Sequence, residues 1–162
     1  MKKTVSLKKL LHELAILKKK KKKIVFTNGC FDIVHAGHVR YLKKARSLGD
    51  CLVVGLNSDS SVKAIKGERR PIVPENERAE VLGGLSFVDY VVKFNDQTPL
   101  KLIEAIRPDI LAKGADWAAK DIAGGDMVRK NGGKIRRITL VKGRSTTNII
   151  KRILELHKEH EG

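Results

Sequence analysis

Two histidines with two residues between them, His35 and His38, stand where an apolar strand is expected to turn into a helix. The run of residues 24–26 precedes the loop TNGCFDIVHAGH, residues 27–38, and an amphipathic stretch follows it. Side chains three apart in a first helical turn lie on the same side, and the amides of a helix N-terminus attract anions. The pair could therefore donate hydrogen bonds to phosphate oxygens, more strongly as charge develops in a transition state.

The two glycines of this loop fit the same chemistry. Gly29 would let the backbone approach a ligand closely, and Gly37 would keep the space between the two rings free of a side chain. Two other roles are open for the histidines. One is a metal site, for which no third ligand has a suitable spacing, and the other is a structural corner.

Strands and helices alternate along the chain, which predicts a single Rossmann-like α/β domain with a doubly wound, five-stranded parallel sheet. Apolar runs predict strands at 23–28, 51–57, 89–94, 109–114 and 134–140. A 3.6-residue period predicts helices at 6–17, 38–50, 74–85, 98–109, 121–133 and 145–159. We expect the fourth strand to lie beside the first. Because ligands bind at the carboxyl ends of such strands, the loop 28–32 should line the binding crevice.

Residue types at the ends of these elements give further local predictions. Ser6 should cap the first helix and Gly49 should end the second. The core face of the last helix is predicted to consist of Ile149, Ile150, Ile153, Leu154 and His157.

The positive charge of the chain, +16 over 162 residues, is unevenly distributed. Residues 1–23 hold ten lysines and one glutamate, a balance of +9, whereas the other 139 residues hold 24 basic and 17 acidic side chains, a balance of +7. We therefore divide the chain into a basic helix with a lysine-rich leader, 1–23, and a domain, 24–162, that should work without the leader. A polyanion-binding role of the run Lys18–Lys23 is the alternative. The body lacks the aromatic interleaving of nucleic-acid platforms, so nucleic-acid binding is not expected.

Composition also bears on location. No apolar run approaches the roughly 20 residues of a membrane span, and the N-terminus has no apolar segment typical of a signal peptide. Cys30 and Cys51 lack CxxC spacing. We expect both to be reduced thiols of a cytoplasmic protein that does not bind membranes.

The stretch FDIVHAGH resembles the H-x-G-H motif of the cytidylyltransferase-like nucleotidyltransferases. Other stretches resemble, in the same order, the heptose 1-phosphate adenylyltransferase branch of that family: VGLNSDSSVKAIKGERRP, VDYVVKF, TPLKLIEAIRPDILAKGADW and STTNIIKRI. The resemblance runs from about residue 24 to 154. Two departures matter: many heptose enzymes are fused to a sugar kinase domain that this chain does not contain, and cytidylyltransferases usually carry GTFD where this chain has GCFD.

The resemblance implies nucleotidyl transfer from ATP to a heptose 1-phosphate, which releases pyrophosphate and forms ADP-heptose, a lipopolysaccharide precursor. It implies Mg²⁺ entering with ATP, no direct protein-only metal site, and a homodimer. The rival enzymes are a cytidylyltransferase acting on a small alcohol phosphate and a GTP-using heptose 1-phosphate guanylyltransferase. A nucleotide-binding module without catalysis is a further alternative, against which the intact histidine pair argues.

The same resemblance assigns the candidate site residues. Catalytic roles are expected for His35, His38 and Lys66. Nucleotide or phosphate binding is expected for Asn28, Gly29, Cys30, Phe31, Asp116, Arg144, Ser145, Thr146 and Thr147, one of whose hydroxyls could simply cap the last helix. Asp32, Lys63, Arg78 and Lys113 are expected near the sugar phosphate or the metal. Other roles are open for some of these residues. Lys63 or Lys66 could instead be solvated, and Arg78 could form an ion pair on a helix surface. Trp117 could pack on the base or in the core.

Overall fold

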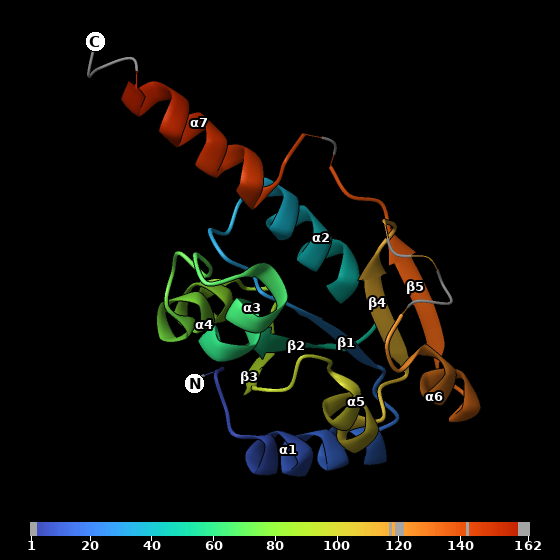
Figure 1. Cartoon of the computed structure of the whole chain (residues 1–162). Helices are drawn as coiled ribbons and strands as arrows, with labels where there is room; N and C mark the ends of the chain where they lie inside the picture. Colours follow the sequence, from blue (N-terminus) through green and yellow to red (C-terminus); the bar gives the residue numbers. More distant parts are fainter. Residues whose placement is uncertain (1–2, 117, 119–121, 142, 159–162) are drawn as a thin grey trace.

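A parallel sheet of five strands in the order β3-β2-β1-β4-β5 forms the centre of the protein, as seen in the computed structural model (Figure 1). The structure describes residues 3–116, 118, 122–141 and 143–158. Its strands are β1 (Ile24–Gly29), β2 (Cys51–Asn57), β3 (Tyr90–Phe94), β4 (Ile110–Gly114) and β5 (Lys134–Ile138). The predicted doubly wound sheet is confirmed, and β4 lies beside β1 as expected. The strand order changes direction between β1 and β4, which creates a switch point at their carboxyl ends.

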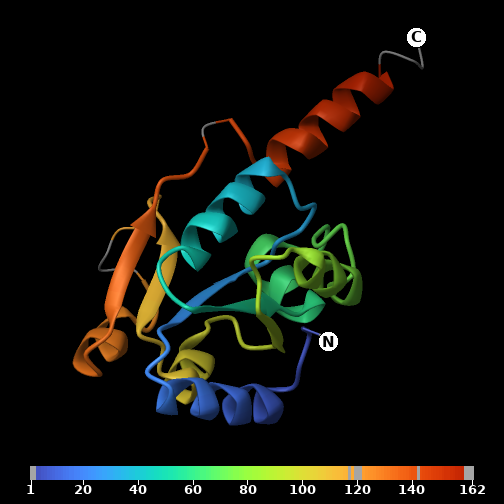
Figure 2. The same cartoon turned by 180° about the vertical axis from the view of Figure 1, so that it is seen from behind.

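Helices cover both faces of this sheet (Figure 2). They are α1 (Leu7–Lys19), α2 (Ala36–Arg46), α3 (Asp59–Lys66), α4 (Glu75–Gly84), α5 (Leu100–Ile106), α6 (Gly125–Lys130) and α7 (Thr146–Lys158). One apolar cluster joins the sheet to α2 and α4, and a second joins it to α1, α5 and α6. Within the described part of the chain, no helix is both long and apolar enough to cross a membrane.

The N-terminal segment packs on the same core as the sheet. Ser6 caps α1 by accepting a hydrogen bond from the Lys9 amide at 3.3 Å, which confirms the predicted cap. Leu10 and Leu14 are buried, at 0% and 2% exposure, in the cluster with α5. Thr4 also forms a parallel bridge with β3. Residues 3–19 thus belong to the same core as the sheet, and the activity of residues 24–162 without the leader stays a prediction.

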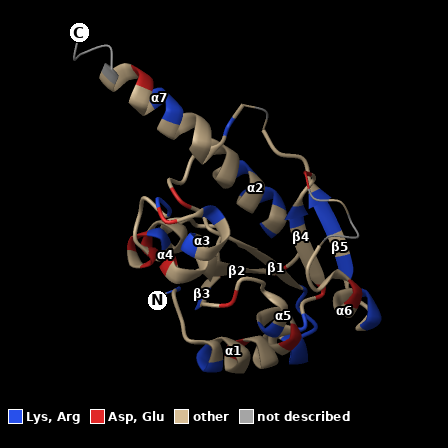
Figure 3. Cartoon of the chain, viewed as in Figure 1, with Lys and Arg blue, Asp and Glu red and all other residues tan. Residues whose placement is uncertain are grey.

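The lysine run Lys18–Lys23, which begins in the last turn of α1, is not uniformly free in solvent. Lys18 Nζ donates to the Ile106 carbonyl at 2.6 Å and to the Arg107 carbonyl at 2.9 Å, so it caps the end of α5. Burial lowers the pKa of Lys18 despite the nearby Asp109. Lys22 pairs with Asp50 at 3.3 Å. Figure 3 colours the basic residues of this region blue, at the end of α1.

Three local predictions were wrong. Residues 59–66 form the helix α3, started by Ser58 Oγ accepting from the Ser61 amide at 3.3 Å, which is absent from the predicted helices. Helix α2 ends at its C-cap Ser47 and not at Gly49. The outer part of α7 projects from the body (Figures 1 and 2), so Ile153 and Leu154, both 56% exposed, and exposed His157 do not form a core face.

Candidate active site

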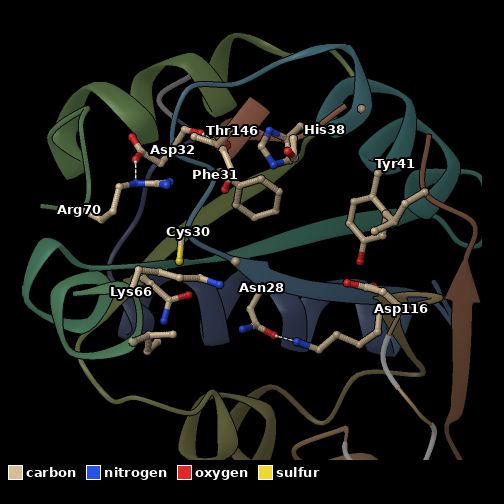
Figure 4. Close-up of a pocket in the computed structure, with 18 of the residues that line it drawn as sticks. Asn28, Cys30, Phe31, Asp32, His38, Tyr41, Lys66, Arg70, Asp116 and Thr146 are labelled. Atoms are coloured by element: carbon tan, nitrogen blue, oxygen red, sulfur yellow. Dashed lines mark hydrogen bonds and ion pairs between the residues drawn. The ribbon is translucent and has the colours of Figure 1, made fainter. Parts of the chain in front are cut away.

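A cavity of about 670 Å³ opens at the carboxyl ends of β1 and β4, at the switch point of the sheet. Among the described residues, four basic side chains line it, from Lys66, Arg70, Lys113 and Arg144, together with the two histidines. Two carboxylates, Asp32 and Asp116, also belong to the lining (Figure 4). The excess of cationic donors makes this cavity suited to a ligand with several phosphate groups. The other lining residues from the predicted set are Asn28, Gly29, Cys30, Phe31, Ser145, Thr146 and Thr147.

The loop between β1 and α2 has an unusual backbone. Phe31 and Ile33 both adopt positive φ angles, 46° and 52°, which are unfavourable for side chains of this kind. Such conformations persist where the surrounding contacts fix them, often at functional sites. Here the fixing contacts are made by Asp32, which lies between the two.

Asp32 connects three segments that are distant in sequence. Its buried carboxylate, 1% exposed, accepts from Arg70 Nε at 2.7 Å and from the amides of Ile72 and Val73 at 2.9 Å each. Burial would raise the pKa of Asp32, but these two amides and the Arg70 guanidinium hold it below its usual value. The Asp32 carbonyl accepts from Thr146 Oγ1 at 2.7 Å. These contacts give Asp32 a positioning role, while direct contact with a sugar phosphate or metal stays a prediction.

His35 and His38 lie face to face at the start of α2. Their ring centroids are 3.9 Å apart with an angle of 24° between the planes, and Phe31 packs edge-on against His38 at 5.4 Å. His35 is the N-cap of α2, because its Nδ1 accepts from the Gly37 amide at 3.1 Å. A neutral imidazole that accepts at Nδ1 carries its proton on Nε2. The cap therefore prepares Nε2 of His35 as a hydrogen-bond donor.

The surroundings of both imidazoles favour their neutral forms. Burial, and then the charge of Arg144, lowers the pKa of His35. Burial, and then the neighbouring His35, lowers the pKa of His38 to about 4, against the opposing effect of Asp32. His38 Nδ1 is buried without a hydrogen-bond partner in the described part of the chain. A bound polyphosphate would favour the protonated forms, so the pair can respond to negative charge placed beside it.

Gly37 leaves the space that the stacked rings need. A Cβ at this position would lie 2.8 Å from His35 Cε1 and 2.9 Å from His35 Nδ1, and 3.3 Å from the Arg144 Cβ. The glycine thus lets the loop before α7 approach the first turn of α2, as well as leaving the His35 ring in place. This confirms the role predicted for Gly37 from its position between the histidines.

The floor of the cavity is formed where β1 and β4 end. Lys113 Nζ donates to Asn28 Oδ1, and Asp116 also lines the cavity, near Asn28 (Figure 4). Burial lowers the pKa of Lys113 to about 8, partly offset by the charge of Asp116. A Cβ on Gly114 would collide with Asp116 Oδ1, so the glycine allows this carboxylate to fold back over the strand end. Trp117, the other candidate of this loop, lies outside the described residues.

The two candidate lysines differ in their position relative to the cavity. Lys66, in the last turn of α3, lines the cavity beside Cys30 (Figure 4). Lys63 is not among the lining residues and lies 4.0 Å from Glu68 on the surface. Burial raises the pKa of the Cys30 thiol, with Lys66 opposing this effect. Of the two, Lys66 is therefore the lysine that can reach a ligand in the cavity.

Arg78 is neither a cavity residue nor part of a surface ion pair. Its side chain is 1% exposed, and its guanidinium donates to the carbonyls of Val73, Cys30 and Asn57. It also pairs with Asp59 at 2.8 Å. Arg78 is not among the cavity-lining residues, because its side chain joins the ends of β1 and β2 to the segment before α4. Its place near the sugar phosphate stays a prediction.

A second group of donors stands at the start of α7. Ser145 Oγ accepts from the Asn148 amide at 3.1 Å, so it caps this helix, as one residue of the group was expected to do. Thr146 is bonded to the Asp32 carbonyl, and exposed Thr147 and Arg144 line the cavity. A phosphate here would meet both the N-terminus of α7 and the Arg144 guanidinium.

Several cavity residues were missed by sequence reasoning. Arg70 belongs to the KGERRP stretch, whose resemblance was noted, but only its contact with Asp32 reveals its function. Tyr41 lies under the cavity, where its hydroxyl bonds Thr27 Oγ1 at 2.7 Å. Burial raises the pKa of Tyr41 to about 12. Its position in α2 looked like that of any core aromatic residue, so no sequence pattern distinguished it.

The described residues contain no group of three or more His, Cys, Asp or Glu side chains that could hold a metal ion. The Asp32 carboxylate is already occupied by three donors. Mg²⁺ keeps several water ligands and is commonly bound through substrate phosphates. The entry of Mg²⁺ with a nucleotide stays a prediction.

Comparisons with known proteins identify the family of the chain. Residues 26–152 match the family model described as cytidylyltransferase-like. The bifunctional protein HldE of Campylobacter concisus is 60% identical over 141 residues, which is 87% of this chain and 29% of that protein. HldE of Syntrophotalea carbinolica is 53% identical over 146 residues, 90% of this chain and 30% of that protein. The chain thus spans about 30% of the length of the curated relatives it matches.

One solved structure is also similar to this chain, over most of the length of both proteins. The crystal structure of the lipopolysaccharide core biosynthesis protein from Thermoplasma volcanium GSS1 is 30% identical, with a TM-score of 0.62, and the match covers 76% of this chain and 99% of that one. The histidine pair, Gly37 and the cavity-lining loops lie within the residues that the family model matches. The chain therefore belongs to the cytidylyltransferase-like family of nucleotidyltransferases.

Proposed function

We propose that the chain transfers the adenylyl group of ATP to a heptose 1-phosphate, releasing pyrophosphate and forming ADP-heptose. The observation that carries this proposal is the stacked pair His35 and His38 at the start of α2, which lies in a cavity with an excess of basic side chains. The heptose acceptor rests on the resemblance of KGERRP and STTNII to the heptose branch, and on the HldE relatives at 53% and 60% identity.

The reaction needs no covalent intermediate on the protein. A phosphate oxygen of the sugar 1-phosphate attacks the α-phosphorus of ATP, one P–O bond forms, and the bond from the α-phosphorus to the bridging oxygen breaks. That oxygen leaves with pyrophosphate and keeps the electron pair. Catalysis then consists of positioning and charge stabilisation.

The histidine pair would stabilise the charge that develops in this step. Nε2 of His35 is a donor in the free protein, because Nδ1 accepts from Gly37, and His38 is stacked on it. Lys66, from α3, and Arg144, before α7, approach the cavity from different segments and would neutralise the β- and γ-phosphates of the Mg²⁺–ATP complex. Donors that are fixed before the reaction cost no reorganisation when charge appears.

The nucleoside would lie over the ends of β1 and β4. Asn28 and Lys113 are held together there, and Asp116 could accept a ribose hydroxyl. We propose ATP over CTP because the GCFD loop and KGERRP resemble the heptose branch. GTP is the closest rival, since it shares the purine frame and differs only in its edge groups.

The test is a matrix of the four nucleoside triphosphates against heptose 1-phosphates of both anomeric configurations, with Mg²⁺ present and pyrophosphate release as the readout. Glycerol 3-phosphate in place of the sugar tests the cytidylyltransferase alternative. The proposal expects the highest kcat/KM for ATP with a heptose 1-phosphate. Highest activity with CTP and the alcohol phosphate would contradict it, and highest activity with GTP would change only the base.

We also propose that the protein acts as a homodimer with small-molecule substrates and does not act on nucleic acid. The limited charge excess of residues 24–162, +7, supports the second part. The absence of a nucleic-acid function is tested by measuring how strongly the protein binds a DNA duplex at physiological salt. The proposal expects only weak, salt-sensitive binding.

A further inference from the structure

The cavity extends beyond the half in which the nucleoside is proposed to lie. That half is over β1 and β4, and the strand order puts β2 and β3 on the opposite side of β1. Asn57, the last residue of β2, and residues 97–99, which follow β3, line the cavity on this opposite side. The proposed nucleotide position uses none of these residues. This side of the cavity is therefore available to the second substrate.

A chain of hydrogen bonds joins three segments on this side. Ser61 Oγ, in the first turn of α3, donates to the Asp96 carbonyl at 2.9 Å, and Asn57 Nδ2 lies 2.9 Å from the same hydroxyl. Asn57 and Ser61 are only 3% and 1% exposed. Because the single hydroxyl proton of Ser61 is used on the carbonyl, the hydroxyl must accept from the Asn57 amide nitrogen. This fixes the orientation of Asn57 and leaves its side-chain oxygen as the atom that can accept from a ligand.

The same chain of hydrogen bonds holds the loop after β3 in place. The Ser58 amide donates to the Phe94 carbonyl at 2.9 Å where the loop begins, and the Asp96 carbonyl is held by Ser61. Gln97 and Thr98 follow directly, are exposed, and line the cavity. The Thr98 hydroxyl does not cap α5, which begins without a side-chain cap. A fixed loop thus brings an amide and a hydroxyl to the cavity.

The groups on this side suit a ligand with several hydroxyls. An amide and a hydroxyl can each donate and accept hydrogen bonds, as a sugar hydroxyl also does. Ile65, 43% exposed, and Pro99 add apolar surface to the same lining, on which the C–H groups of a sugar can pack. Lys66, at the end of α3, adds a positive charge. A mostly apolar wall with a few placed polar groups is the usual composition of a small-molecule site.

We infer that Asn57, Gln97 and Thr98 bind the hydroxyl groups of the acceptor sugar, and that Ser61 positions them. The inference deepens the proposed function and rests on it for the identity of the acceptor. The acceptor phosphate would meet the α-phosphate near the histidine pair, because the pair follows β1, the strand between the two halves. The acceptor sugar is then selected by groups that the nucleotide does not contact.

The experiment combines steady-state pyrophosphate release by the full chain with calorimetric binding of Mg²⁺–ATP. Gln97→Ala and Thr98→Val should each raise KM for heptose 1-phosphate by about three- to tenfold, the size expected for the loss of one neutral hydrogen bond. The dissociation constant for ATP should stay unchanged. Asn95→Ala is the matched control, because Asn95 is exposed in the same loop but does not line the cavity. It should change neither quantity.

Ser61→Ala tests the positioning role. It removes the hydroxyl between Asn57 and Asp96 but no group that contacts the sugar. We expect KM for heptose 1-phosphate to rise while kcat and the dissociation constant for ATP stay unchanged, a split that a general loss of stability would not produce. Circular dichroism and urea unfolding establish that the variant is folded. If it does not fold, the exposed positions Gln97 and Thr98 decide the inference.

The outcomes separate this inference from the proposed function. Unchanged KM in Gln97→Ala and Thr98→Val would overturn the inference, and so would a matching rise in the dissociation constant for ATP, since the residues would then bind the nucleotide. A wild-type chain that is most active with another acceptor would overturn the proposed function alone. The variants are then measured with that acceptor, and its KM decides the inference in the same way. No turnover with any acceptor would overturn both.

Discussion

Replacing Gly37 by alanine tests whether the geometry of the histidine pair matters. The new Cβ would stand 2.8 Å from His35 Cε1. Ordinary contact begins at 3.4 Å, so the ring would have to move by 3.4 − 2.8, or about 0.6 Å. The same movement would disturb the 3.9 Å stacking on His38 and the 3.1 Å bond from the Gly37 amide to Nδ1.

A displacement of this size should be costly for catalysis and cheap for folding. Misplacing a catalytic group by about 1 Å can reduce the rate by about 10², so we expect Gly37→Ala to lower kcat by about 10- to 100-fold. In contrast, alanine is favoured over glycine within a helix by up to about 1 kcal/mol, and the loss of the cap bond costs a similar amount. The two nearly cancel, so the free energy of unfolding should change little.

The assay is steady-state pyrophosphate release with ATP and heptose 1-phosphate, combined with denaturant unfolding. Gly83→Ala in α4 is the control, because the nearest atoms to its new Cβ are 3.8 and 3.9 Å away, which is ordinary contact. It should keep full activity. The reasoning is refuted if Gly37→Ala retains wild-type kcat, or if it loses activity only because it no longer folds.

Three further results are expected. Arg78→Ala should destabilise the protein by about 3 kcal/mol or more in urea unfolding, because it leaves several buried carbonyls without a donor, whereas Ala at exposed Arg69 should have little effect. Leu10→Ala should cost about 2–5 kcal/mol in the same assay, and Ala at Leu7, 38% exposed in the same helix, much less; equal small effects would show that the N-terminal helix is dispensable. His38 has a folded-state pKa of about 4 and an ordinary value of 6.5, so the unfolded state binds more protons between these values; its contribution to stability is complete above about 6.5 and is lost as pH falls toward 4. His38→Gln should make unfolding free energy depend less on pH in this window, and an unchanged dependence would contradict the pKa assignment.

The sheet and the location of the site could be predicted because they depend on local patterns. Alternating apolar runs and helical periods predicted all five strands, and the placement of loops at the carboxyl ends of parallel strands brought the region 28–32 to the cavity. The function of Gly37 followed from its position between two residues of one helical turn. Ser145 was similarly readable as one of several possible helix caps.

Apart from the missed helix α3 and the cap at Gly49, what sequence reasoning did not foresee are contacts between residues distant in sequence. Asp32 meets Arg70 across 38 positions, and Arg78 reaches the Cys30 carbonyl across 48. No periodicity encodes such pairs, so the burial of the Arg78 guanidinium was not predicted. The apolar stripe of α7 was assigned to the core for a related reason, since a stripe shows that a face is apolar without showing what covers it.

The central claim is that His35 and His38 stabilise the transition state of nucleotidyl transfer. The measurement that tests it most directly is kcat for His35→Ala and His38→Ala in pyrophosphate release, together with the dissociation constant for ATP of each variant. The account predicts that kcat falls by about 10² or more in both variants, while the dissociation constant changes only a few-fold. Near wild-type turnover in either variant would contradict the role assigned to that histidine.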